Sequence, residues 1–127
     1  MNEKRNDKFD LEERLIEFSV FIIKITENLI NTRAGNHMAG QLVRSGTAPA
    51  LLYGEAQSAE SRNDFVHKLK ILLKELRETL VALKIIKRVP LIKTIELVDK
   101  AMIECNELIS IFVKSIETAR KNNEKGK

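Results

Sequence analysis

Apolar residues recur along the chain at alternating spacings of four and three, the pattern of helices that keep one face against a neighbour. The first such row predicts a helix over about 10–32. Asp10, with Glu13 three positions on, forms a carboxylate variant of a capping box at its start, and Gly35 supplies the chain reversal after it. The row consists of Leu11, Leu15, Phe18, Ile22, Ile25 and Leu29.

A second row predicts a helix over about 36–60, with Asn36 as its N-cap. This segment holds most of the small residues of the chain, which let neighbouring helices approach closely, so we expect it to be the most buried helix. Pro49 removes one backbone donor and crowds the carbonyl of Ser45, which predicts a kink between the two rather than two separate helices. The row is Met38, Leu42, Ser45, Pro49, Leu52, Ala56 and Ala59.

Two further rows predict helices over about 61–88 and 91–121. Ser61 followed by Asp64 marks the start of the third helix, and Val89-Pro90 ends it, because the residue before a proline is pushed out of helical geometry. The tails, 1–8 and 122–127, are expected to fray. The rows are Phe65, Leu69, Leu72, Leu76, Thr79, Leu83 and Ile86, then Ile95, Val98, Met102, Cys105, Ile109, Phe112 and Ile116.

Four helices joined by short connections predict a single all-α domain over 1–127, an antiparallel up-down-up-down four-helix bundle. The first and fourth helices also carry second apolar rows. These rows fit either a wide core stripe or a subunit interface, and the pattern favours neither. They are Ile16, Val20, Ile23 and Ile30 on the first helix, and Leu97, Ala101, Leu108 and Ile111 on the fourth.

Composition narrows the class of protein. Of the 127 residues, 43% are hydrophobic and 31% charged, which is typical of a globular chain and not of a disordered one. One cysteine, Cys105, cannot form an internal disulfide, which favours a reducing cytoplasm. The charged N-terminus predicts no signal peptide, and every apolar cluster is broken by charge, so we expect a soluble cytoplasmic protein with no membrane partner.

Charge is distributed unevenly between the helices. Residues 10–32 carry two cations against five acids, a net −3, whereas residues 61–88 carry eight cations against three acids, a net +5. Six basic residues of the third helix follow heptad spacing, with Val81 as the one gap, opposite its apolar row. Such a stripe can neutralise phosphates of RNA or DNA without reading bases, although a solvated face is the alternative. The stripe is His67, Lys70, Lys74, Arg77, Lys84 and Arg88.

The sequence contains few features that would support a catalytic function. The sequence has no glycine-rich phosphate loop, no paired-cysteine motif and no nucleophile elbow, and it lacks the Glu-x-x-His pairs of a di-iron site. We therefore expect no enzyme activity, no catalytic residues, no metal and no cofactor, and we interpret Cys105 as a buried structural thiol. Arg44 needs a carboxylate partner among small and apolar neighbours, which predicts a structural ion-pair network inside the bundle with Glu55, Glu75 and Glu78.

Several segments in a fixed order resemble one bacterial protein family. The segments are Gln41-Leu42-Val43-Arg44-Ser45-Gly46-Thr47, Gly54-Glu55-Ala56, Ser58-Ala59-Glu60-Ser61-Arg62-Asn63-Asp64-Phe65 and Leu73-Lys74-Glu75-Leu76-Arg77-Glu78-Thr79. They look like the four-helix-bundle family that includes the intervening-sequence proteins of large-subunit ribosomal RNA genes. That family also takes in the accessory protein of diversity-generating retroelements.

The resemblance implies an up-down bundle that assembles as a homopentamer, a basic surface for nucleic acid, and a reverse transcriptase as a possible partner. It also implies that the matched residues pack and pair between the second and third helices. From the residues and the resemblance together we expect a non-enzymatic, oligomeric accessory protein that binds RNA or DNA backbone through the stripe. The alternative is a protein–protein scaffold, or a self-assembling structural protein, that binds no nucleic acid.

Overall fold

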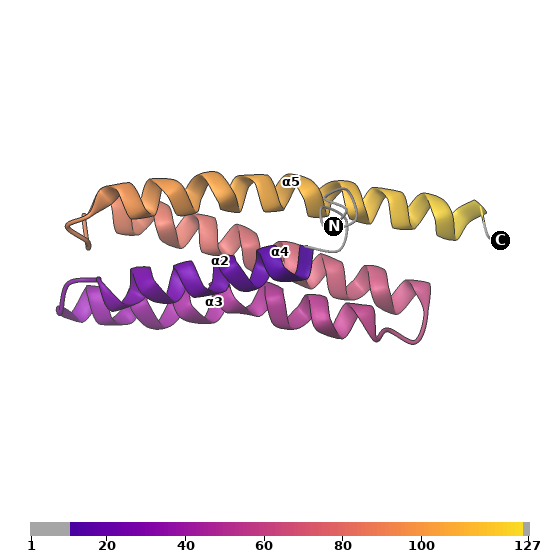
Figure 1. Cartoon of the computed structure of the whole chain (residues 1–127), viewed down its shortest axis with the longest axis horizontal. Helices are drawn as coiled ribbons and strands as arrows, with labels where there is room; N and C mark the ends of the chain where they lie inside the picture. The colour runs from indigo at the N-terminus through magenta and orange to yellow at the C-terminus, as the bar shows by residue number, and fades with distance from the viewer. Residues whose placement is uncertain (1–10, 126–127) are drawn as a thin grey trace, which may run out of the picture.

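The computed structural model describes residues 11–125, which fold into four helices that lie along a common long axis (Figure 1). They are α2 (Leu11–Glu27), α3 (Arg33–Gln57), α4 (Arg62–Arg88) and α5 (Ile95–Lys125). Within this range there is no strand, and the single isolated β-bridge pairs Leu29 with Ile92. The prediction of an all-α fold with four helices is confirmed.

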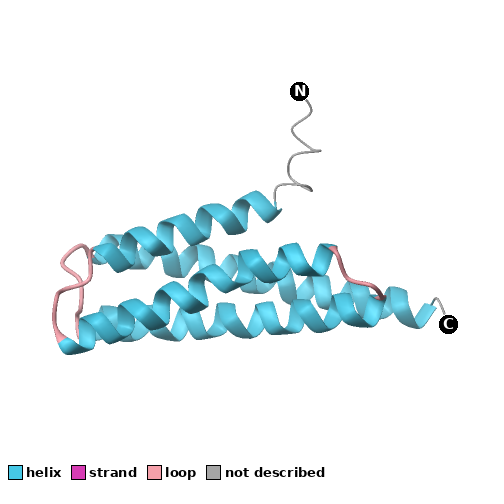
Figure 2. Ribbon diagram, turned by 90° about the horizontal axis from the view of Figure 1, so that it is seen from below, coloured by secondary structure: helices cyan, strands magenta, loops and turns pink. Residues whose placement is uncertain are grey.

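The connections between the helices gather at the two ends of the long axis. The α2–α3 and α4–α5 connections lie together at one end, and the α3–α4 connection lies at the other (Figure 2). At the shared end the backbone N–H of Ile30 donates to the carbonyl of Leu91 at 2.9 Å, beside the Leu29–Ile92 bridge. Two segments about sixty positions apart in the chain are therefore held side by side.

This pairing shifts the helix boundaries at that end away from those predicted. The first helix stops at Glu27 rather than 32, because Leu29 and Ile30 leave it to pair with the α4–α5 connection. The N-cap of α3 is Thr32, whose hydroxyl accepts from the backbone N–H of Gly35 at 3.0 Å, so the predicted Asn36 cap is wrong. Gly35 lies inside the first turn of α3 rather than in a reversal.

The fourth helix is displaced for the same reason. Leu91 and Ile92 are buried in the connection, so α5 begins at Ile95 and not at 91. It continues to Lys125, which makes positions 122–125 helical where fraying was predicted. The predicted Asp10 cap, the tail 1–8 and positions 126–127 lie outside the described residues.

The helices on either side of the α3–α4 connection lie close to their predicted bounds. Ser61 caps α4 by accepting from the backbone N–H of Asp64 at 3.0 Å, and α4 ends at Arg88 before Val89-Pro90. Pro49 lies inside α3, which continues through it as one helix to Gln57.

The core is formed by the inward rows of all four helices. α2 and α3 approach each other closely at Gly46, where an added Cβ would lie 2.6 Å from Cγ2 of Ile22. Yet α3 is not the most buried helix, since it buries six of its 25 residues against eight of 27 in α4. The absence of a side chain permits close approach at Gly35 and Gly46, but Gly40 and Gly54 face open space.

The two second apolar rows differ in their exposure to solvent. On α5 the row belongs to the core, with Ala101 and Leu108 fully buried. On α2 the side chains of Ile16, Val20 and Ile23 are each 40% exposed. A core stripe therefore accounts for the α5 row, and an apolar surface remains on α2. None of the described helices has the length and apolarity needed to cross a membrane.

Candidate nucleic-acid interface

The basic stripe lies on the outer face of α4. Its inward row is buried down to Ile86, and with 3.6 residues per turn the positions opposite that row point to solvent. All six predicted residues are exposed, and they span about 32 Å at 1.5 Å per residue. They are His67, Lys70, Lys74, Arg77, Lys84 and Arg88.

The five lysines and arginines of the stripe have no ion-pair partner among the described residues. Two other cations of α4, which point toward neighbouring helices, are paired: Lys68 Nζ lies 3.0 Å from Glu55 Oε1, and Lys87 Nζ lies 2.7 Å from Asp99 Oδ1. These seven cations of α4 thus form a lateral pair bound to carboxylates and an outward set of five that faces solvent.

Arg44 bridges α3 and α4 through two of its predicted partners. Its Nη1 lies 3.1 Å from Glu75 Oε1, and its Nη2 lies 2.6 Å from Glu78 Oε2. The predicted network inside the bundle is wrong in two respects. The Arg44 side chain is 53% exposed, so the cluster lies on the surface, and Glu55 pairs with Lys68 instead.

The cluster also has an electrostatic consequence. The hydrogen bond from Arg44 holds the pKa of the Glu78 carboxyl below its usual range, and the nearby charge of Lys74 acts in the same direction. Glu78 therefore stays ionised and cross-links the two helices beside the stripe. Lys74 also attracts this carboxylate electrostatically, although the two side chains form no ion pair.

A groove runs along α4 on its α3 side, with a volume of about 840 Å³. Its surface is mainly apolar, and cations are among its lining residues. We call this feature the α3/α4 groove. It is lined by Met38, Gln41, Arg44, Ser45, Lys70, Leu73, Lys74, Arg77, Glu78, Val81, Ala82 and Ile85. Three of the stripe cations thus also border an apolar depression, whereas His67, Lys84 and Arg88 lie outside it.

Comparison with known proteins places the chain in a family. No protein-family model matches it, and no curated protein matches it either. A solved structure does, that of a protein of unknown function from the S23 ribosomal protein family of Bacteroides thetaiotaomicron VPI-5482. It has 31% sequence identity to this chain and a TM-score of 0.76, over 83% of this chain and 96% of that one.

The chain belongs to the S23 ribosomal protein family. The narrower resemblance to intervening-sequence proteins and to retroelement accessory proteins stays a prediction. In this S23-family chain the stripe lies on α4, and the groove lies between α3 and α4.

The remaining candidate chemistry of this S23-family chain is confined to the core. Cys105 is buried, its Sγ lies 3.2 Å from the carbonyl oxygen of Leu76, and burial raises the pKa of its thiol to about 12. Within the described residues, no three His, Cys, Asp or Glu side chains form a group that could hold a metal ion.

The groove is the feature that sequence reasoning missed. The heptad pattern shows Val81 only as a gap in the stripe, although Val81 and Ile85 on the outside of α4, and Val89 just after its end, recur every fourth residue. All three are exposed, and Val81 is 54% exposed. The sequence did contain a signal for the groove: the helix has a second line of apolar residues in addition to its complete inward row.

Proposed function

We propose that this S23-family protein binds the phosphate backbone of RNA or DNA through the α4 stripe. The observation that supports the proposal is the set of five outward cations without an ion-pair partner in residues 11–122, on a helix whose lateral cations are paired. An unpaired cation in solvent can exchange its counterions for a phosphate, and the released counterions favour binding.

The form of the stripe favours backbone contact over base recognition. Lysine and arginine side chains spaced along about 32 Å of helix can follow successive phosphates. No aromatic side chain is interleaved with them, so bases have nothing to stack on. A family named for a ribosomal protein is in keeping with RNA as the partner.

We infer a binding role rather than a catalytic one, because the sequence has no motif for phosphate or nucleophile chemistry. The placement of the connections at alternate ends supports the up-down-up-down order (Figure 1). The resemblance supports a homopentameric accessory protein, with a reverse transcriptase among its possible partners.

A second candidate function is self-association or scaffolding. The three exposed apolar side chains of α2, Ile16, Val20 and Ile23, favour it, since a contiguous apolar row on a surface usually marks an interaction site.

Removal of four stripe charges tests the first proposal. In a variant with Lys70, Lys74, Arg77 and Lys84 changed to alanine, we expect loss of binding to a single-stranded RNA and to a DNA duplex of matched length. The slope of log K against log salt should fall in magnitude by about 3, since each lost phosphate contact removes about 0.7–0.9.

A matched control removes the same charge elsewhere. Lys93, Lys100, Lys114 and Arg120 are exposed and in no ion pair with another described residue, so their change to alanine should leave both affinity and slope nearly intact. Equal affinities for the wild type and the stripe variant would refute the proposal, and so would equal losses in the stripe and control variants.

A further inference from the structure

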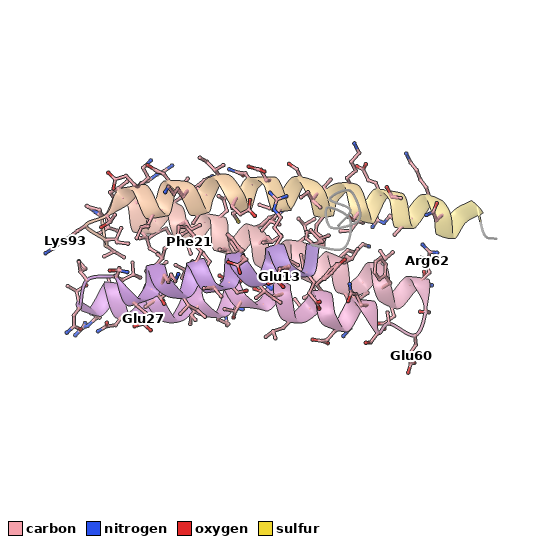
Figure 3. All side chains as sticks on the ribbon, in the orientation of Figure 1. Glu13, Phe21, Glu27, Glu60, Arg62 and Lys93 are labelled. Carbon is pink, nitrogen blue, oxygen red and sulfur yellow. The ribbon has the colours of Figure 1, made fainter. Side chains whose placement is uncertain are left out.

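A smaller pocket lies at the end of the molecule where α3 connects to α4. Its volume is about 290 Å³. Figure 3 labels Arg62 at this end, next to the connection. We call this feature the connection pocket. It is lined by Ala56, Gln57, Ala59, Ser61, Arg62 and Phe65.

Backbone hydrogen bonds hold the walls of the connection pocket in place. The N–H of Ala59 donates to the carbonyl of Ala56 at 3.1 Å, and the N–H of Phe65 donates to the carbonyl of Ser61 at 3.0 Å. The hydroxyl of Ser61 is fixed as well, because it accepts from the N–H of Asp64 at 3.0 Å. A ligand would therefore meet a preformed pocket and lose little conformational entropy in ordering it.

The lining combines an aromatic ring with polar side chains. Phe65 packs against the core and stays partly exposed, whereas Gln57 and Arg62 are exposed. Arg62 has no ion-pair partner among the described residues, so its guanidinium is available to donate hydrogen bonds. The amide of Gln57 can both donate and accept. Proteins that hold an unstacked nucleobase use this combination, an aromatic face for the ring and polar groups for its edge.

The connection pocket lies just before the start of the stripe, on the same helix. Phe65 precedes His67 by two residues and Lys70 by five, about 3 Å and 7.5 Å along α4. The stripe itself contains no aromatic side chain. A strand that follows the stripe toward the start of α4 would therefore reach an aromatic ring only at this pocket.

We propose that the connection pocket binds one base of a single-stranded RNA or DNA whose phosphates lie on the stripe. The base stacks on Phe65, and Arg62 and Gln57 hydrogen-bond to its edge. The size of the pocket suits this ligand, because sites for whole small molecules occupy about 300–1,000 Å³ and this pocket is at the lower limit. The inference rests on the proposed backbone binding and adds the form of nucleic acid that is bound.

A pocket of this kind selects for unpaired strands. In a duplex every base is stacked and paired, so filling the pocket would first require one base to leave the helix at a cost in free energy. A base in a single strand, a loop or a frayed end is already accessible. Because every base has a π face, stacking on Phe65 discriminates single strand from duplex more than one sequence from another.

Phe65→Leu tests the inference, since leucine keeps an apolar side chain against the core and removes the aromatic face. The matched control is Phe21→Leu, which makes the same change at another phenylalanine that packs against the core and is partly exposed, on α2 and outside the pocket (Figure 3). Fluorescence anisotropy gives the affinities of each protein for a short single-stranded RNA, for its duplex, and for an abasic strand of the same length. Circular dichroism and thermal unfolding confirm that each variant is folded.

The expected loss is confined to one ligand. Phe65→Leu should weaken binding of the single-stranded RNA by about five-fold or more, the lower limit for one base on an aromatic ring, and leave the duplex and the abasic strand unaffected. The slope of log K against log salt should match that of the wild type, because no phosphate contact is lost. Phe21→Leu should change none of these values.

A crosslink on the unchanged protein gives the same information without a substitution. A single strand that carries 4-thiouridine should crosslink under ultraviolet light to a residue within 56–65, located by mass spectrometry, and the duplex should not. A crosslink of the single strand that maps only to other parts of the chain would overturn the inference.

The affinities can also overturn it. Equal single-strand affinities for folded Phe65→Leu and the wild type would do so, and so would an equal loss for the duplex or the abasic strand. If the stripe variant flattens the salt dependence while Phe65→Leu changes nothing, the pocket inference alone is wrong. If Phe65→Leu weakens only single-strand binding while the stripe variant binds like the wild type, the stripe proposal is wrong and the base site stands without it.

Discussion

Gly46 is the position where a single methyl group tests the packing of α2 against α3 most directly. A Cβ at this position would lie 2.6 Å from Cγ2, 3.0 Å from Cγ1 and 3.1 Å from Cβ of Ile22. Ile22 is fully buried and β-branched, so it has little freedom to turn away. Gly46→Ala therefore forces either Ile22 or the helix axis to move.

The expected magnitude follows from two opposing effects. Overpacking of a well-packed core costs about 1–3 kcal/mol, and the replacement of glycine by alanine inside a helix contributes up to about 1 kcal/mol of stabilisation. The net result is a loss of about 1 kcal/mol in the free energy of unfolding. Gly40 of the same helix has no heavy atom within 4 Å of an added Cβ, so Gly40→Ala should instead stabilise by about 0.5–1 kcal/mol.

Urea unfolding of the two variants and the wild type at one protein concentration provides the comparison. Because the propensity contribution is common to both variants, their difference isolates the cost of the contact with Ile22, about 1–3 kcal/mol. A Gly46→Ala protein as stable as Gly40→Ala would refute the close approach of α2 and α3. Fixed concentration matters, because association would otherwise add to the stability of each variant.

Two further predictions concern ion pairing and the buried thiol. Arg14 donates from Nε and Nη2 to Glu104 at 2.7 and 2.8 Å and from Nη2 to Glu107 at 2.8 Å, and its side chain is about one-third exposed. Arg14→Met should therefore cost only about 0.5–1 kcal/mol in low salt and less in 1 M salt, and an equal loss in both would contradict an ion-pair origin. Burial raises the pKa of Cys105 to about 12, above the value near 8.5 of an unfolded thiol, so the unfolded chain loses its proton first and stability falls as pH rises from about 8.5 toward 12. Cys105→Ala should remove this part of the slope between pH 8 and 10.5 in urea unfolding, and identical slopes for the two proteins would refute it.

The inward rows made the helices predictable. Residues such as Leu15, Ile22 and Leu72 repeat at a period that only a helix can bury on one side, and all three are fully buried. The same reasoning located the stripe, since surface positions follow from the core positions of an amphipathic helix. The two ends of α4 were also predictable, because the signals for them are local. Ser61 caps the helix through a residue three positions away, and Val89-Pro90 directly follows its last residue.

The remaining features depend on contacts between distant parts of the chain. Leu29 and Leu91 have the apolar character of helix residues, and only their proximity across the end of the molecule takes both out of their helices. The small sequence neighbours of Arg44 predict an enclosed side chain, but its exposure depends on which face of α3 meets α4. The groove is likewise a property of two helices together, so no single row could reveal it.

The attachment of α2 at both of its ends has a further consequence. Near its start the guanidinium of Arg14 is held by two carboxylates of α5, and just beyond its end Ile30 is hydrogen-bonded to Leu91. These restraints oppose rotation of α2 about its own axis, so Ile16, Val20 and Ile23 cannot turn inward. A partner that binds this face meets a preorganised surface and loses little conformational entropy in ordering it.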